Sequence, residues 1–287
     1  MTSIQPVPPD DPRLLGLRHL LAVIDRLRAP DGCPWDREQT EASMAPYLIE
    51  EAHEWLEAIE EGTIAQAEAE AGDALLGVLM ICRIAQDDGR YDLGAAAEHC
   101  AQKLIRRHPH VFDPAYVGEF GGKEWEAIKR AERQSGGEDS SAMAGIPSGL
   151  PALQRVARAS GKSIGAGFAW PTIAGALDKV IEELGELREE LSKDDLDAAP
   201  GTAPAGQNRP AVEHELGDLL LASATLARYL DLDPEALCRR AVRRFESRFR
   251  AMEDSLDGPM SDQDLACLLN AWEASKAAEG PAKSVEP

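Results

Sequence analysis

Apolar residues recur along this chain at the spacing of an amphipathic helix. In residues 14–28, leucine, valine and isoleucine follow one another at intervals of three and four, which places them on one face of an α-helix. Similar segments continue to the C-terminus, without a convincing run of alternating apolar and polar residues. Prolines and glycines cluster between these segments, as in residues 29–36 and 145–151, where helix breakers belong. The pattern predicts an all-α fold.

The same series of segments occurs twice along the chain. The first half contains CPWD, IEEAHEWLEAIEEG, EAEAGDALLG, KLIRRHPHVF and WEAIK. The second half contains GFAWP, IEELGELREEL, EHELGDLLLA, RRFESRFR and WEASK. Five matched segments in one order, offset by 132 to 147 residues, indicate a tandem duplicated helical domain.

Composition suggests where the two copies begin and end. Residues 133–149 are rich in glycine and serine and poor in large apolar residues, so they are the predicted linker between a first domain, 1–132, and a second domain, 150–276. Residues 197–211 have the composition of a mobile loop inside the second domain. Residues 277–287 resemble a frayed tail.

Paired carboxylates carry the candidate chemistry. Glu183 and Glu186 are three residues apart, and Glu215 and Asp218 repeat this spacing on the next predicted helix. Residues three apart share a helix face, so each pair repels itself unless a cation lies between its members. Carboxylate oxygens suit Mg²⁺ or Mn²⁺ and offer no soft ligand for zinc. The corresponding residues of the first copy are Glu51, Glu54, Glu70 and Asp73.

The carboxylates of the second copy lie beside an apolar stripe. On its first acidic helix the stripe leaves Glu183 roughly 90° and Glu186 roughly 150° from the centre, so we expect both side chains off the core. Glu215 and Asp218 have the same placement on the next helix. Glutamates on a helix usually form a solvated face, but two ordered pairs that occur in both copies favour a metal site.

Cations and aromatic residues follow the carboxylates in the second copy. Arg240, Arg244 and Arg248 recur every four residues and form one column of a predicted helix, and guanidinium donors fit phosphate oxygens. Trp272 and Lys276, one turn apart, could stack a base and contact a phosphate. A solvated basic face and ordinary core packing explain these residues equally well.

Further aromatic residues stand before the acidic helices. Trp35, Phe168 and Trp170 could line a base pocket, although packing is an equal explanation. In the first copy only Lys103 and Arg107 occupy the positions of the second copy's last two column arginines.

Charge, cysteines and missing motifs exclude several classes of function. A net charge of -21 argues against a nucleic-acid-binding protein. No apolar run approaches the roughly 20 residues that span a bilayer, and the N-terminus lacks a secretory signal. Five widely spaced cysteines without a CxxC pair indicate reduced thiols. We therefore expect a cytoplasmic protein, and the absence of a P-loop, a GxGxxG fingerprint, a GxSxG elbow and an HExxH motif leaves the carboxylates as the candidate site.

The repeated motifs of this chain resemble those of the MazG family of nucleoside triphosphate pyrophosphohydrolases. The resemblance to the first family domain is carried by CPWDREQT (33–40), YLIEEAHEWLEAIEEG (47–62), AGDALLG (71–77), GRYDLGAAAEHCAQKLIRRHPHVF (89–112) and WEAIKRAE (125–132). The resemblance to the second is carried by GAGFAWP (165–171), LDKVIEELGEL (177–187), HELGDLLLASATLARYL (214–230) and RRFESRFR (243–250). It implies an all-α homodimer that shares helices across its interface and cleaves nucleoside triphosphates between the α and β phosphates, with magnesium.

Site residues follow from this resemblance position by position. The implied metal ligands are Glu183, Glu186, Glu215 and Asp218, and in the first copy Glu51, Glu54, Glu70 and Asp73. The implied nucleotide contacts are Lys179, Arg244, Arg248, Trp272 and Lys276. Where this chain has Arg244, the family more often has lysine, and where it has Ala71, the family more often has leucine. A carboxylate outside the ligand set has to accept the proton of the attacking water, and Glu182 and Glu50 remain alternatives.

The sequence thus predicts broad hydrolysis of nucleoside triphosphates to monophosphate and pyrophosphate, in control or cleaning of the nucleotide pool. One alternative is a narrow-substrate all-α pyrophosphohydrolase that acts on dUTP or phosphoribosyl-ATP. Another is a helical binding or regulatory module without activity. Because the second copy has the arginine column, a long loop, and Lys179 where the first has Tyr47, we expect it to carry most of the turnover.

Overall fold

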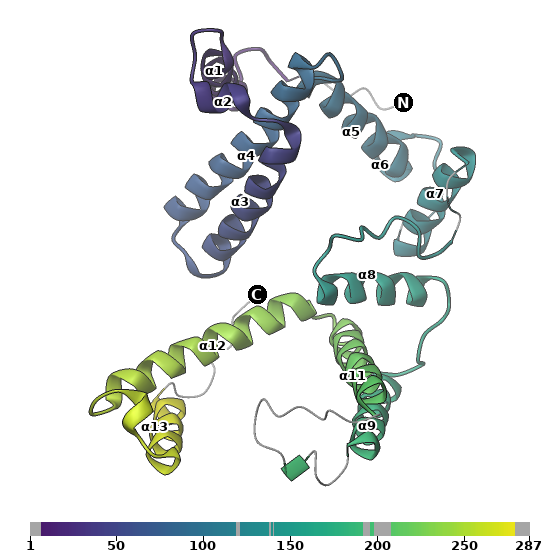
Figure 1. Ribbon diagram of the computed structural model, residues 1–287. Coiled ribbons are helices and arrows are strands. Elements are labelled where there is room, and N and C mark those ends of the chain that lie inside the picture. Colours follow the sequence, from purple (N-terminus) through teal and green to yellow (C-terminus); the bar gives the residue numbers. More distant parts are fainter. Residues whose placement is uncertain are drawn as a thin grey trace. The chain divides into compact units, whose positions relative to one another are not determined.

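A computed structural model describes the chain over residues 7–118, 121–137, 139, 141–191, 196–197 and 208–278, with the side chains of 123 and 135 left out. Every regular element within these ranges is a helix, which confirms the all-α prediction. The chain forms two compact units, Met1–Ile128 and Lys129–Pro287, and Figure 1 traces both. Most of the predicted loop 197–211 and nearly all of the predicted tail lie outside the described residues.

The first unit is built around a helical hairpin, α3 (Glu41–Glu61) and α4 (Ile64–Asp87), which pack along each other (Figure 1). Thr40 and Thr63 begin these helices, and each closes a capping box with the residue three positions later. Gly62 ends α3, where an added Cβ would lie 2.7 Å from the Ala58 carbonyl oxygen. The remaining elements are α1 (Pro12–Arg28), α2 (Pro34–Glu38), α5 (Leu93–Arg107), α6 (Pro109–Phe112) and α7 (Gly122–Ser135), the last of which continues into the second unit.

The core of the first unit lies between α1, α3 and α4. Ile24, Met44, Leu79, Met80 and Ile84 form its buried cluster. Ile24 and Leu79 are 1% and 2% exposed, so these two side chains have lost nearly all contact with water, which stabilises the packing of α1 across α4.

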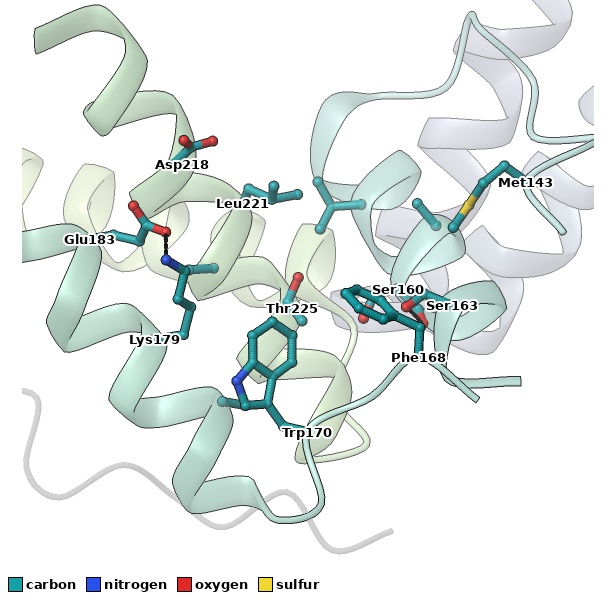
Figure 2. A pocket seen from close by; sticks show the side chains of 14 residues that line it. Met143, Ser160, Ser163, Phe168, Trp170, Lys179, Glu183, Asp218, Leu221 and Thr225 are labelled. Carbon is teal, nitrogen blue, oxygen red and sulfur yellow. Dashed lines mark hydrogen bonds and ion pairs between the residues drawn. The ribbon is translucent and has the colours of Figure 1, made fainter. Parts of the chain in front are cut away.

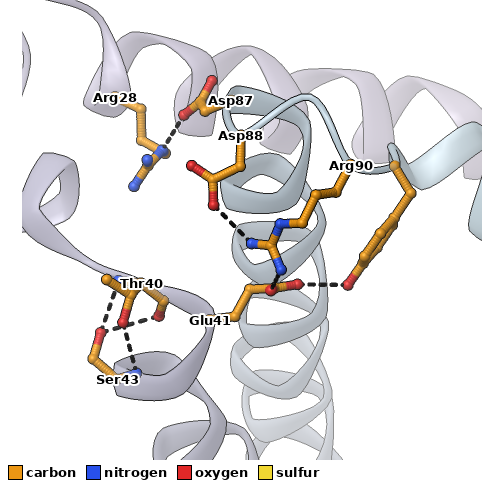
Figure 3. A network of polar contacts seen from close by, with 8 residues as sticks. Arg28, Thr40, Glu41, Ser43, Asp87, Asp88 and Arg90 are labelled. Atoms are coloured by element: carbon orange, nitrogen blue, oxygen red, sulfur yellow. Dashed lines mark hydrogen bonds and ion pairs between the residues drawn. The ribbon is translucent and has the colours of Figure 1, made fainter.

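A group of polar contacts joins the start of α3 to the loop between α4 and α5 (Figure 3). The Arg90 guanidinium pairs with Glu41 and with Asp88, and the Tyr91 hydroxyl donates to Glu41 Oε1 at 2.7 Å. The hydrogen bond from Tyr91, followed by the pairing with Arg90, holds the pKa of Glu41 below its ordinary value. We call Glu41, Arg90 and Tyr91 the clasp, because they join the start of α3 to the loop that follows α4.

The second unit repeats the hairpin. Helices α9 (Ile173–Glu190) and α11 (Arg209–Tyr229) pack along each other, as α3 and α4 do, and the tandem duplication is confirmed. Helix α8 (Ala152–Gly165) packs against α11 and α12, and α12 (Pro234–Ser255) pairs with α13 (Leu265–Ala278) after a short 3₁₀ turn, Met260–Asp262.

The buried residues of α9 and α11 include four alanines. Ala176, Ala222, Ala224 and Ala227 are each at most 8% exposed, so the core of this unit is built partly from small side chains. The predicted apolar stripe of α9 is only partly covered. Leu177, Ile181 and Leu184 are 46%, 60% and 55% exposed in the single chain, whereas Val180 and Leu187 are half-buried, so the prediction that the stripe faces the core is wrong for the first three residues.

Candidate active site

Three carboxylates of the second unit converge on one point. Glu183 and Glu186 come from α9 and Glu215 from α11, and each offers an oxygen that lies within 4.8 Å of the others. Glu183 is only 5% exposed, which contradicts the prediction that it lies off the core. Glu183 shares a helix face with Ala176, seven residues earlier and 3% exposed, so this face of α9 is the one that is covered.

Asp218, the fourth predicted ligand, lies one turn further along α11. Its Oδ2 atom is 3.4 Å from Nε2 of His214, and it is not part of the group of three. Asp218 and Glu183 nevertheless line the same pocket (Figure 2). The structure therefore brings three of the four predicted side chains together, and the fourth, Asp218, lies outside this group and lines the adjacent pocket.

The first unit has a matching group. Glu51 of α3, with Glu70 and Asp73 of α4, offers three oxygens within 4.8 Å of one another, and Glu54 is outside this group. Here the last carboxylate of the motif takes part, whereas in the second unit its counterpart Asp218 does not. The two units together thus use all four motif positions, as expected if the four carboxylates share one rim.

The grouping is electrostatically unfavourable without a cation. Desolvation, then the charges of Asp73, Glu54 and Glu70, raise the pKa of Glu51. In the second unit, partial desolvation of a side chain that stays exposed, then its contact with Glu183, raise the pKa of Glu186. An all-oxygen donor set under mutual repulsion fits a hard divalent cation.

Lys179 supplies a positive charge to the second group. Its Nζ atom is 2.8 Å from Glu182 Oε1 and 2.6 Å from Glu183 Oε1, and the second contact is visible in Figure 2. The hydrogen bonds to Glu182 and then Glu183 raise the pKa of Lys179, so the ammonium stays charged. Glu182, one of the two candidate bases, is 57% exposed and is held by this contact.

A pocket of about 250 Å³ opens beside the second group, between α8, α9 and α11. Lys179, Glu183 and Asp218 line it together with Phe168 and Trp170, the aromatic residues that precede α9. Trp170 is positioned by Tyr229, whose hydroxyl accepts a hydrogen bond from its backbone N–H at 2.7 Å and whose ring meets the indole edge-on. In the first unit, Trp35 makes a similar edge-on contact with Tyr47.

The predicted nucleotide contacts on the last helices do not reach this pocket. No lining residue in the described part of the chain belongs to α12 or α13, so Arg244, Arg248, Trp272 and Lys276 stay apart from it. Trp272 instead packs on Phe245, with ring centroids 5.4 Å apart, and Lys276 pairs with Glu273 at 2.9 Å. Of the predicted nucleotide contacts, the pocket contains Lys179 alone.

Sequence reasoning missed the contribution of α8. Ser160 is 8% exposed and lines the pocket. It falls four residues after Val156, which also lines the pocket, so a serine at an apolar position of the helical pattern was the available signal. Met143, inside the predicted linker, lines the pocket as well.

These features define a helical protein with one carboxylate site of metal-binding type in each of two repeated hairpins. The family model of the MazG nucleotide pyrophosphohydrolase domain matches residues 39–112 and 172–251, so each matched segment contains one hairpin and its carboxylates. The chain belongs to this family.

Relatives with assigned names support the same family. A Thermotoga maritima protein named nucleoside triphosphate pyrophosphohydrolase/pyrophosphatase MazG is 37% identical over 265 residues, which cover 91% of this chain and 95% of the relative. An Escherichia coli K12 protein named nucleoside triphosphate pyrophosphohydrolase is 36% identical over 266 residues, 91% of this chain and 97% of its own length. A Mycolicibacterium smegmatis protein of that name is 31% identical over 68% of this chain and 63% of its own length. None of the helices in the described residues has the length and apolar character needed to cross a membrane.

Proposed function

We propose that this chain hydrolyses nucleoside triphosphates to nucleoside monophosphate and pyrophosphate at the carboxylate group of the second unit. The observation that carries the proposal is the convergence of Glu183, Glu186 and Glu215, of which Glu183 also lines a pocket. Membership of the family, whose relatives are named for this activity, makes the chain an enzyme and not a binding module.

Magnesium is the proposed cofactor, with manganese as a substitute. The proposed ligands are Glu183, Glu186, Glu215 and, after a side-chain rotation, Asp218; those of the first unit are Glu51, Glu54, Glu70 and Asp73. A bound divalent ion supplies Lewis acidity and offsets the charge of the phosphates.

The protein's own residues orient the substrate and move the proton. Lys179, already charged beside Glu183, binds a phosphate oxygen at the entrance of the pocket. An attacking water has to lose a proton, and Glu182, which is exposed and outside the ligand group, is the proposed acceptor in the second unit. Glu50 has the same place in the first unit. Attack at the α phosphorus then releases pyrophosphate.

A second copy of the chain completes the site in this proposal. The exposed leucine face of the α9–α11 hairpin is too apolar to remain in water, and Arg244, Arg248, Trp272 and Lys276 lie away from the pocket of their own chain. A homodimer covers the apolar face and brings helices of the partner to the carboxylates. A role for nucleic acid or membranes is not part of the proposal, and a cytoplasmic location remains a prediction from the sequence.

The range of nucleoside triphosphates that the enzyme hydrolyses can be measured directly. We favour a broad enzyme of the nucleotide pool over one restricted to dUTP or phosphoribosyl-ATP. Pyrophosphate release should be measured with Mg²⁺ for canonical and damaged triphosphates and for these two compounds. Turnover of one substrate alone would favour the narrow enzyme. Release of inorganic phosphate with a diphosphate would show that the wrong bond has been assigned.

A further inference from the structure

The pocket beside Glu183 has one wall that comes from outside the α9–α11 hairpin. Helix α8 supplies Val156 and Ala159 to this wall, and Met143 comes from the segment that precedes α8. Figure 2 shows Met143 on the opposite side of the pocket from Lys179 and Glu183. The charged side suits phosphates and a cation, so Met143 lies on the side that remains for the rest of a substrate.

Local hydrogen bonds fix the backbone at Met143. Its N–H donates to Ser141 Oγ at 3.1 Å, and the N–H of Ala144 donates to the Ser141 carbonyl oxygen at 3.1 Å. Gly145 follows with a φ of 75°, a conformation that glycine adopts more readily than other residues. The composition of this segment predicts a linker between domains, and here the structure gives it a defined turn.

Packing alone does not account for the side chain of Met143. Its neighbour Ala144 is 8% exposed and anchors the turn against the second unit, whereas Met143 is 44% exposed. Single exposed apolar side chains are common on protein surfaces, but Met143 is one of the residues that line the pocket. Its atoms are therefore accessible from the space in which a ligand lies.

We propose that Met143 limits the size of the nucleobase that the enzyme accepts. This inference rests on the function proposed above, because that function places the triphosphate beside Lys179 and Glu183 and leaves the base on the side of α8. A thioether side chain is apolar, flexible and polarisable, so it contacts an aromatic ring without demanding a particular pattern of donors and acceptors. Met143 therefore selects by size: purine and pyrimidine bases fit, and a base with a further ring meets the side chain.

The pocket is small enough for one side chain to matter. Its volume is about 250 Å³, below the roughly 300–1,000 Å³ of ordinary ligand pockets, so it takes part of a nucleotide and leaves the rest outside. Replacing Met143 by alanine removes the thioether from the wall, and replacing it by tryptophan fills part of the space. Met143 lies outside the two segments matched by the family model, so that match does not describe this wall.

The test compares substrates whose bases differ in size. The kcat/KM values for CTP, ATP and ethenoadenosine triphosphate, whose base has a third ring, are measured with Mg²⁺ on the wild type, Met143→Ala and Met143→Trp. In Met143→Ala we expect the ratio of ethenoadenosine triphosphate to ATP to rise about tenfold, the effect of a small change in pocket volume. Met143→Trp should lower kcat/KM about tenfold more for ATP than for CTP. Active variants with the ratios of the wild type would overturn the inference.

Thermal unfolding separates a change of the wall from a change of the fold. Because Met143 is exposed, Met143→Ala should change the Tm little. Met143→Leu has a side chain of similar size and should keep the ratios of the wild type. An equal loss for all three substrates together with a lower Tm would assign Met143 a structural role. If Met143→Trp does not fold, Met143→Ala decides alone.

The matched control is Met260→Ala. Met260 is a half-buried methionine of the same unit, in the 3₁₀ turn before α13, and is not among the residues that line the pocket. Its replacement should leave all ratios unchanged. A wild type that releases pyrophosphate from no triphosphate would refute the proposed function and this inference with it, whereas active enzymes with equal ratios in wild type and Met143→Ala would refute only the limit on base size.

Discussion

Single side chains distinguish the two candidate sites. The second unit has Lys179 at 2.6 Å from Glu183, while the first has Tyr47 in that position, engaged with Trp35. In the first unit Arg107 lies over the Trp125 ring, with its guanidinium carbon 5.7 Å from the centroid. The clearest difference between the two sites is therefore the ammonium of Lys179, which has no counterpart at Tyr47.

A pair of conservative variants tests this difference. Asp218→Asn keeps the shape of a predicted metal ligand and removes its charge, and we expect a loss of about 10²-fold or more in kcat. Asp73→Asn makes the equivalent change in the first unit and should cost much less. Pyrophosphate release by both purified variants checks the order. Abolished turnover in Asp73→Asn beside near-normal Asp218→Asn would assign the working site to the first unit.

At the scale of secondary-structure elements, each hairpin is a pair of helices whose carboxylates repel one another. The pKa values of Glu51 and Glu186 are raised, so when no cation is present the ionised form of each carboxylate is less favourable than that of an isolated glutamate. A divalent ion that binds the folded hairpin and not the unfolded chain stabilises the fold by mass action. Metal binding should therefore be visible without any turnover.

This stabilisation is measured as the Tm in Mg²⁺ relative to the Tm in EDTA. We expect a positive shift for the wild type, since saturation at a hundredfold excess over Kd contributes about 2.7 kcal/mol. Glu215→Gln should reduce the shift, and the double variant Glu70→Gln, Glu215→Gln should remove it. A shift of full size in the double variant would place the metal elsewhere.

The clasp predicts a dependence of stability on pH. The pKa of Glu41 is lowered in the folded state, so its contribution is complete above the ordinary glutamate value of about 4.3 and is lost as the pH falls through the lowered value. Glu41→Gln should thus lower the Tm at pH 7, and the Tm difference from the wild type should shrink as the pH falls toward 3. Glu57→Gln, at an exposed position of the same helix, is the control. An equal Tm difference at both pH values would contradict the prediction.

At the scale of the whole molecule, the second unit leaves a broad apolar surface uncovered. Leu177, Ile181 and Leu184 on α9, with Leu216 and Leu220 on α11, are between 46% and 60% exposed. Surfaces of this kind mark protein interfaces. In a closed symmetric pair the same helices of both chains can cover one another.

The predicted assembly is a homodimer. Light scattering should give about twice the chain mass of 31.0 kDa, and Leu220→Glu should shift the mass toward one chain because it places a charge in the interface. If the partner's α12 and α13 complete the site, as proposed, activity should fall with the dimer. A fully active monomer would contradict both the assembly and the shared site.

Local patterns were sufficient for much of this description. Periodicity alone predicts the helices, and the repeated order of segments predicts two copies, because both depend only on neighbours along the chain. Residue identity also determines the hardness of the metal site: Glu183, Glu186 and Glu215 offer only oxygen. Because Glu183 and Glu186 share a helix face and Glu215 lies on the next helix, the sequence predicted that the three carboxylates lie close together. The structure brings them together.

Tertiary structure decided which faces meet, and for a physical reason. Apolar residues occur on more than one side of α9, so helical periodicity cannot tell which side packs inside the chain; in the structure Ala176 and Glu183 are buried and Leu184 is exposed. The same packing places Ser160 of α8 in a pocket with Trp170 of the following loop. It also leaves Arg244 and Trp272 apart from that pocket. Each of these results depends on contacts between segments distant in sequence, which no single segment contains.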